Sequence, residues 1–446
     1  MNSRERIWAA IKHQEADRVP IDIGGTGVTN INLNAYANLK KHLGLTDGMA
    51  RVFHTWIQVA EIEPALRARL HSDTVTLPRY KMSLGVPNAE FKPFTFDFIP
   101  DTPFLVPVGF NPGRNEGGDY VWYEHDVLLA EQPIEGKQGY SLRYHPLREA
   151  TTEREIDEWF DTYDGNFLGR IRVTDEEVEW ARAFAKHLRE TTDQAIVADY
   201  FGTVLEAAQG IIGWDTIYMH MLSEPQLAHH FFDRLSHELV TGIKKYLSAV
   251  GEYIDIFMFA DDLGHQRGPM MKHEIYREMV FPGHQAVFQA VKENSQAAIF
   301  FHTDGTVISL LPDLIEAGMD IFNPVQTDAA QMDPAMLKKE FGNQITFWGG
   351  GIDTHSVLPF GTPDEVREDV KRRIEILGPG GGFVFASIHN MLGDAPPENI
   401  LAAVDTVLEM GQYPIRFENE TWAELGARLS AENYWKHPLE NIQAGK

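Results

Sequence analysis

From about residue 195 onward, short apolar runs of the sequence alternate with amphipathic helical segments. The runs are nearly continuous in hydrophobicity, which is typical of parallel strands that are buried on both faces. They cover residues 195–200, 254–260, 297–301, 321–322, 345–348 and 383–386. Strands that alternate with helices in this way form βα units around a parallel sheet. We therefore expect an α/β protein, a (β/α)8 TIM barrel, with residues 1–446 forming a single domain.

Helix start signals lie between these runs. Thr362 and Glu365 form a predicted capping box, with Pro363 at the first helical position. Apolar residues follow at positions 366, 370, 374 and 377, a spacing that places them on one helical face. Nearer the N-terminus we expect a helix from Ser3 to Lys12 and a first strand from Val19 to Ile23.

Residues 87–150 interrupt the alternation. They are rich in proline, glycine and aromatic residues, and residues 119–129 with 139–144 are typical of a β-hairpin. We expect an insertion in the N-terminal half that lies over the barrel mouth. Aromatic residues there would either wall a pocket or pack on one another: Trp56, Phe96, Trp122 and Tyr123. Residues 415–446 are expected to form a C-terminal extension.

Composition excludes several classes of partner and site. The formal charge is −26, from 39 Lys and Arg against 65 Asp and Glu. Nucleic acids and anionic membranes require clustered positive charge, so neither is expected as a partner. The absence of cysteine excludes disulfides, a cysteine nucleophile and thiolate metal ligands. The sequence shows no signal-peptide pattern and no apolar run of the roughly 20 residues that span a bilayer, so we expect a cytoplasmic protein.

Polar or ionisable residues follow each apolar run. In a βα barrel the active site lies at the C-terminal ends of the strands, so these positions are the candidate site. They are Asp199 and Tyr200, Asp261 and Asp262, His302 and Asp304, Asn323 and Gln326, Asp353, and His389. His302 and Asp304 stand two positions apart, and in an extended segment two such side chains point to the same side.

Each of these residues also has a structural explanation. Asp261 and Asp262 are adjacent, so they face opposite ways, and either one can cap the following turn. His302 can donate to a backbone carbonyl, and His389 can belong to a structural loop. Asp304 is harder to explain in this way, because a carboxylate at a strand end is costly to bury unless it is paired. The prediction of a site therefore rests on the convergence of all these groups at one end of the barrel.

A cluster of His302 and Asp304 with one or two of Asp261, Asp262 and His389 suits a divalent metal. Imidazole and carboxylate ligands fit zinc, and also iron or manganese. Such an ion polarises a leaving oxygen or nitrogen, or lowers the pKa of a bound water. The alternative is that the carboxylates accept hydrogen bonds from a cationic substrate and neutralise it.

Several motifs resemble the uroporphyrinogen decarboxylase superfamily and occur in the same order. They are Arg4-Glu5-Arg6, Asp17-Arg18-Val19-Pro20, Asp261-Asp262-Leu263-Gly264, His302-Thr303-Asp304-Gly305, Asp320–Gln326, Gly350-Gly351-Ile352-Asp353 and Pro396–Ile400. The resemblance implies a βα barrel. The true decarboxylases grip porphyrin carboxylates with an arginine-rich segment, whereas residues 23–28 here contain no arginine. The sequence is more similar to the methyltransferase branch, which moves methyl groups between small methylated compounds, corrinoid proteins and thiols.

In that branch a His-x-Cys-Gly motif holds zinc. His302 matches the histidine, Asp304 replaces the cysteine, and glycines 380–382 stand where thiol-activating relatives have a second cysteine. The resemblance therefore implies a metal with nitrogen and oxygen ligands, or no metal. No Rossmann, P-loop or corrinoid-binding glycine pattern is present, so a corrinoid would be carried by a separate protein.

The resulting hypothesis is a methyltransferase that removes a methyl group from a small methoxylated or N-methylated compound and passes it to a corrinoid protein. His302 and Asp304 would bind zinc or another divalent metal, and Asp261 or Asp262 with His389 would be catalytic. The substrate-binding candidates are Asp199, Tyr200, Asn323, Gln326 and Asp353. The alternatives are a metal-free decarboxylase or lyase acting on a small carboxylic acid, and a non-catalytic metabolite-binding barrel.

Overall fold

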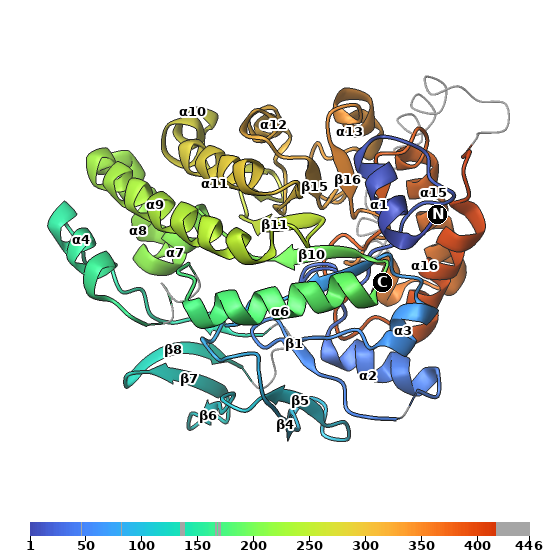
Figure 1. The fold of residues 1–446 in the computed structure, drawn as a ribbon, viewed down its shortest axis with the longest axis horizontal. Coiled ribbons are helices and arrows are strands. Elements are labelled where there is room, and N and C mark those ends of the chain that lie inside the picture. The colour runs from blue at the N-terminus through green and yellow to red at the C-terminus, as the bar shows by residue number, and fades with distance from the viewer. Residues whose placement is uncertain (46, 82, 134–138, 166, 168–170, 416–446) are drawn as a thin grey trace, which may run out of the picture.

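The computed structural model describes residues 1–446 except 46, 82, 134–138, 166, 168–170 and 416–446. Its centre is a seven-stranded parallel sheet in the order β17-β16-β15-β14-β11-β10-β3 (Figure 1). The strands are β3 (Thr74–Leu77), β10 (Ala195–Asp199), β11 (Ile256–Ala260), β14 (Ala298–His302), β15 (Ile321–Asn323), β16 (Thr346–Trp348) and β17 (Phe383–Val384). The six apolar runs of the sequence correspond to β10, β11, β14, β15, β16 and β17, and the predicted ends differ from the observed ones by at most two residues.

The predicted first strand, residues 19–23, closes this sheet into a barrel. The N–H of Phe385 donates to the Pro20 carbonyl (2.8 Å), and the N–H of Asp73 donates to the Ile21 carbonyl (2.6 Å). The segment thereby joins β17 to β3. It forms isolated bridges instead of a regular ladder, because Pro20 has no N–H and the Ile21 N–H is taken by the Asp73 carboxylate (2.9 Å). The TIM-barrel prediction is confirmed.

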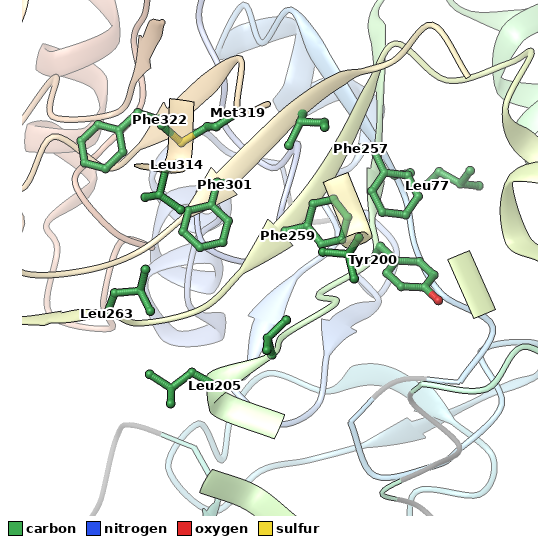
Figure 2. Close-up of a cluster of buried hydrophobic side chains, with 14 of the residues drawn as sticks. Leu77, Tyr200, Leu205, Phe257, Phe259, Leu263, Phe301, Leu314, Met319 and Phe322 are labelled. Atoms are coloured by element: carbon green, nitrogen blue, oxygen red, sulfur yellow. The ribbon is translucent and has the colours of Figure 1, made fainter. Parts of the chain in front are cut away.

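Alternate strand residues form two apolar cores. One set fills the barrel interior, and it includes Val197, Ile256, Met258, Ala298, Phe300, Ile321 and Trp348. The other set faces the surrounding helices, and Figure 2 shows part of it: Tyr200, Phe257, Phe259, Phe301 and Phe322. Because side chains alternate along a strand, His302 shares the interior side with Ala298 and Phe300. Tyr200 points outward.

Helices cover the outside of the barrel and connect the strands. They are α1 (Ser3–Ile11), α2 (Leu33–His42), α3 (Pro64–Arg69), α4 (Glu153–Thr162), α6 (Asp175–Thr191), α7 (Leu205–Ile212), α8 (Trp214–Ser223), α9 (Pro225–Val250), α10 (His273–Ile275), α11 (Phe281–Asn294), α12 (Leu311–Ala317), α13 (Pro334–Phe341), α14 (Val357–Phe360), α15 (Pro363–Leu377) and α16 (Pro397–Met410), with short turns η1 (Tyr276–Val280) and η2 (Ile308–Leu310). The predicted capping box of α15 is present. The Thr362 side chain accepts from the Glu365 N–H, and the Glu365 side chain accepts from the Thr362 N–H. None of the described helices has the length and apolar character of a membrane span.

The interruption of the pattern corresponds to two small antiparallel sheets outside the barrel. One pairs β4 (Phe91–Phe94) with β5 (Phe104–Pro107), and the other joins β6 (Gly113–Arg114), β7 (Tyr120–Glu124), β8 (Val127–Gln132) and β9 (Ser141–Leu142). Shorter pairs are β1 (Val52–His54) with β2 (Val59–Ala60), and β12 (Gly264–His265) with β13 (Gly268–Pro269). Figure 1 shows β4–β8 as a group apart from the barrel strands. The predicted hairpin of 119–129 with 139–144 differs from the structure, because the hairpin turn lies between β7 and β8, within the first predicted strand, and β9 pairs with the end of β8. The expected extension at 415–446 lies outside the described residues apart from 415.

Candidate active site

A cavity of about 590 Å³ lies at the C-terminal ends of the barrel strands. Barrel residues that line it include Ala260, Asp262, His302 and His389. On another side, the insertion contributes Leu129, Tyr140, Ser141 and Leu142. The inserted β-sheet thus covers the mouth of the barrel, and the ionisable strand-end residues line the same cavity.

Three of these strand-end residues, His302, Asp304 and His389, form a compact cluster. The Asp304 Oδ2 lies 3.8 Å from Nε2 of His302 and 3.7 Å from Nε2 of His389. One ligand atom from each residue can be chosen so that all lie within 4.8 Å of one another. In a tetrahedral zinc site, ligand atoms about 2.0–2.1 Å from the ion are roughly 3.3–3.4 Å apart. The two distances from Asp304 exceed this spacing by about 0.4 Å, and the limit of 4.8 Å for the whole cluster leaves up to about 1.4 Å to close, so binding of a divalent ion requires the side chains to move closer together.

Asn323 fixes the orientation of the His302 ring. The Asn323 side-chain N–H donates to the Trp348 carbonyl (2.8 Å), so its Oδ1 faces Nδ1 of His302 (2.6 Å). Since an amide oxygen only accepts, Nδ1 carries the proton. The opposite nitrogen, Nε2, faces the Asp304 carboxylate (3.8 Å) and is the atom that could bind an ion. An acceptor on the other ring nitrogen is what a metal-binding histidine ordinarily has.

The backbone of Asp304 is fixed by a hydrogen bond, whereas one of its side-chain oxygens has no hydrogen-bond partner among the described residues. Its N–H donates to the Asp262 carboxylate (2.8 Å). The next residue, Gly305, has φ +85°, and a Cβ there would lie 2.5 Å from the Gly264 backbone. Only glycine allows this approach. Oδ1 of Asp304 is buried and has no hydrogen-bond partner among the described residues, which is a costly state for a carboxylate unless a ligand compensates it.

Asp262 is the inward-facing member of the Asp261-Asp262 pair. Burial and the neighbouring Asp304 carboxylate raise the pKa of Asp262 to about 6. Burial lowers the pKa of His389 from its ordinary value, which favours the neutral imidazole that a metal requires. This part of the site therefore combines an imidazole that burial favours in its neutral form with a carboxyl group, Asp262, that gains or loses its proton just below neutral pH.

Asp261 is not brought into the cavity, contrary to one of the two sequence alternatives. Its side chain is fully buried and accepts from the N–H groups of Val204, Leu205 and Glu206 at the start of α7 (2.9, 2.6 and 2.6 Å). It also pairs with Nε2 of His284 (2.8 Å). Its acceptor capacity is shared between the helix terminus and His284, and these contacts place it outside the cavity.

The predicted substrate-binding residues Asp199, Tyr200 and Asp353 do not line the cavity either. Tyr200 points into the outer core beneath the Arg79 guanidinium (4.3 Å from the ring centroid). Asp353 accepts from the N–H groups of His355 and Ser356 (2.7 and 2.8 Å) and so holds the turn that precedes α14. Asp199 faces the barrel interior, where Gly27 donates to it (3.2 Å) and burial raises its pKa to about 8.

The remaining two, Asn323 and Gln326, lie near the cluster but serve other groups. Asn323 orients His302, as described above, and Gln326 accepts from the Gly305 N–H (2.6 Å). Gln326 also lines a second cavity of about 200 Å³, together with Asp304, Thr354, His355 and His389. His389 therefore contacts both cavities.

Sequence inspection missed several cavity residues. Glu206 begins α7, and Phe201 and Gly202 follow β10 directly after the two residues that had been selected there. Phe201 has φ +53°, which is rare for an aromatic residue, and no sequence signal reveals it. Among the aromatics proposed for the pocket, Trp56 lines it.

The other three pocket aromatics lie in the insertion but away from the cavity. Phe96 packs with Phe94 (4.9 Å between ring centroids), Trp122 stacks on Phe110 (5.9 Å), and Tyr123 is exposed. Packing within the insertion, the alternative explanation, therefore accounts for them.

Glycines 380–382 do not stand at the position of a metal ligand. They precede β17, and a Cβ on Gly381 would lie 2.5 Å from the Gln14 carbonyl, at the opposite end of the barrel from the cavity. The third member of the cluster is His389, which comes after β17. The glycines that the resemblance places where relatives have a second cysteine therefore lie away from the cluster.

The family profile described as "Uroporphyrinogen decarboxylase (URO-D)" matches residues 168–410. That match spans more than half of the chain and includes β10 to β17, with every member of the cluster. The chain belongs to the uroporphyrinogen decarboxylase family.

Individual members of the uroporphyrinogen decarboxylase family are distant. Uroporphyrinogen decarboxylases from Psychromonas ingrahamii and Neisseria meningitidis are 24% identical over 190 and 201 residues, which is 42% and 44% of this chain. The matches span about half of the relatives, 49% and 52% of their lengths. A solved methyltransferase from Methanosarcina mazei superposes with a TM-score of 0.56 at 15% identity, over 92% of this chain and 99% of that one. This similarity concerns the fold.

Proposed function

We propose that this protein is a methyltransferase that takes a methyl group from a small methylated compound and passes it to a corrinoid carried by a separate protein. The observation that carries the proposal is the cluster of His302, Asp304 and His389 beside the covered cavity, which His302 and His389 line, with a buried Asp304 oxygen that has no partner among the described residues. Nitrogen and oxygen ligands of this kind suit zinc or another divalent ion.

Decarboxylation of uroporphyrinogen is disfavoured by the charge of the cavity. Among the described residues that line it, none is Lys or Arg, whereas Asp262 and Glu206 are acidic. A substrate that bears many carboxylates would lose its hydration there without gaining a Lys or Arg counter-ion from the described lining residues. The same reasoning argues against the alternative of a decarboxylase or lyase acting on a small acid.

The side chains divide the work of methyl transfer between them. His302, Asp304 and His389 would hold the ion, which supplies Lewis-acid polarisation of the atom that bears the methyl group. Asn323 keeps Nε2 of His302 free to ligate. Asp262 faces the cavity with a pKa of about 6, so it can hold a proton for the leaving oxygen or nitrogen. The inserted sheet limits access of water to the site.

The proposal is tested by measuring methyl transfer from a panel of methoxylated and N-methylated compounds to reduced cobalamin, beside the metal content of the purified protein. We expect transfer by the wild type, and loss of both transfer and metal in His302→Ala. His187→Ala, on the exposed face of α6, is the matched control and should match wild type. Release of carbon dioxide from an acid without methyl transfer would identify a decarboxylase, and binding without turnover would identify a binding barrel.

A further inference from the structure

The residues that line the cavity away from the cluster indicate which class of substrate it can bind. Away from the cluster, the lining is predominantly apolar and aromatic, and it includes Trp56, Tyr140, Phe167, Phe201 and Trp214. The rings of Trp56 and Tyr140 lie 6.0 Å apart (centroid to centroid). Aromatic walls favour flat, apolar ligands through offset and edge-to-face contacts. A volume of about 590 Å³ is typical of pockets that take small organic molecules.

The charges around the cavity disfavour an anionic substrate. The described lining residues offer the carboxyl groups of Asp262 and Glu206 and no Lys or Arg. Two of the four histidines among the described lining residues, His54 and His389, have surroundings that favour an uncharged ring. His54 accepts the Ile57 N–H at Nδ1 (3.4 Å) and contacts the Ser83 hydroxyl through Nε2 (2.9 Å).

The cluster disfavours a fully alkylated ammonium as the donor. The nitrogen of such a group has no lone pair, so it cannot be polarised by an ion at His302, Asp304 and His389. An ether oxygen does have lone pairs. Among ethers, an aryl methyl ether suits both the aromatic walls and the chemistry, because a phenol is far more acidic than an alcohol and its anion leaves more readily.

We propose, on the basis of the methyl transfer put forward above, that the donor is an uncharged aromatic methyl ether, and that the cavity discriminates against ring carboxylates through Glu206 and Asp262. In the reaction the bond between the methyl carbon and the ether oxygen breaks. The acceptor supplies the electron pair for its new bond to the methyl group. The oxygen leaves as a phenolate and takes up a proton, for which Asp262 is placed in the cavity wall.

The experiment is isothermal titration calorimetry of the metal-loaded protein, without acceptor, against three probes. These are guaiacol, which is neutral; vanillate, which adds a carboxylate to the same ring; and phenyltrimethylammonium, a cationic N-methyl compound. Guaiacol is expected to bind at least about tenfold more tightly than vanillate. Glu206→Arg should reduce or reverse this ratio, and Glu206→Gln should reduce it by less. Asp233→Arg makes the same charge change on the exposed surface of α9 and should leave the ratio unchanged.

Several outcomes would overturn the proposal. They are equal or tighter binding of vanillate, tightest binding of the ammonium, no binding of guaiacol, or a ratio that does not respond to Glu206. Because binding is measured without an acceptor, this result is independent of turnover. Guaiacol that binds but yields no methyl transfer would retain the ligand class and refute the methyltransferase. Transfer from a different class of donor would retain the methyltransferase and refute the ligand class.

Discussion

Two histidine–carboxylate clusters lie side by side at the strand ends of this barrel, and their hydrogen bonding differs sharply. In the first, Asp261 accepts from three N–H groups and from His284, with both side chains almost fully buried. In the second, Asp304 lies 3.7–3.8 Å from His389 and His302 and keeps one oxygen without a partner among the described residues. In the first cluster, protein groups supply the hydrogen bonds of the carboxylate. In the second, one carboxylate oxygen is left for a ligand to contact.

Residue type and position at a strand end therefore do not distinguish a structural carboxylate from a functional one. Asp261 and Asp262 are neighbours in one motif, yet one caps α7 and the other faces the cavity. What distinguishes them is whether the protein itself supplies all their hydrogen bonds. Changes in the satisfied cluster should therefore cost stability, and changes in the unsatisfied cluster should cost ligand binding and activity.

The largest expected effect is the loss of activity in Asp304→Ala. We expect methyl transfer to fall by about 10³-fold or more and bound metal to be lost, because the carboxylate is the only anionic member of the cluster. The free energy of unfolding of the metal-free protein should change by less than about 1 kcal/mol. Metal analysis, turnover and urea unfolding measure the three quantities. A strongly destabilised variant would contradict the distinction between the clusters.

The opposite pattern is expected for Asp261→Asn. The amide presents a single acceptor oxygen, so it leaves α7 N–H groups or His284 without a partner in a fully buried site. We expect a loss of about 3 kcal/mol in the free energy of unfolding, measured by urea denaturation. The folded protein should still bind metal, with at most a small change in affinity. Loss of metal without loss of stability would place Asp261 in the functional cluster instead.

Asn323 connects the second cluster to the barrel, and a pair of substitutions isolates its role. Asn323→Leu should weaken metal affinity by about 10–100-fold, because Nδ1 of His302 loses its acceptor and the ring orientation is no longer fixed. Asn323→Asp keeps an acceptor oxygen at this position and should retain most of the affinity. Competition with a chromogenic chelator measures both. Equal losses in the two variants would indicate a packing role for Asn323.

Much of the fold and part of the site could be predicted from the sequence. The apolar runs give the parallel strands because both faces of each strand are buried, and the alternation along Ala298 to His302 directs His302 into the barrel. The direction of Asp261 could not be obtained in this way, since it lies beyond the strand end. Its partners, at the start of α7, are more than fifty residues away along the chain.

Other parts of the site depend on geometry that leaves no sequence signal. Phe201 enters the cavity through a backbone conformation with φ +53°, and Glu206 does so because Asp261 anchors the start of its helix. His389 joins His302 because β17 and β14 end at the same rim. The family resemblance places glycines 380–382 where relatives have a second cysteine, but those residues precede β17, and the third member of the cluster is His389, which the strand-end pattern already offered as a candidate.

The smallest expected effect on activity concerns Asp199, which tests whether an unsatisfied carboxylate always indicates function. Its Oδ1 also has no partner among the described residues, but no histidine accompanies it, and burial raises its pKa to about 8. The folded protein therefore keeps this carboxyl protonated, whereas the unfolded chain ionises it near its ordinary pKa of about 3.9. Between these values the folded state binds more protons, so the contribution of Asp199 to stability falls as the pH rises towards 8. Asp199→Asn should remove this dependence, so the free energy of unfolding of the variant relative to wild type should be higher at pH 8.5 than at pH 5 by on the order of 4 kcal/mol. Urea unfolding at the two pH values measures the effect, and unchanged methyl transfer would show that a lone protonated carboxyl is structural. If the variant instead lost metal or activity, a missing hydrogen bond alone would suffice to mark a functional carboxylate, and the presence of histidines would not be part of the criterion.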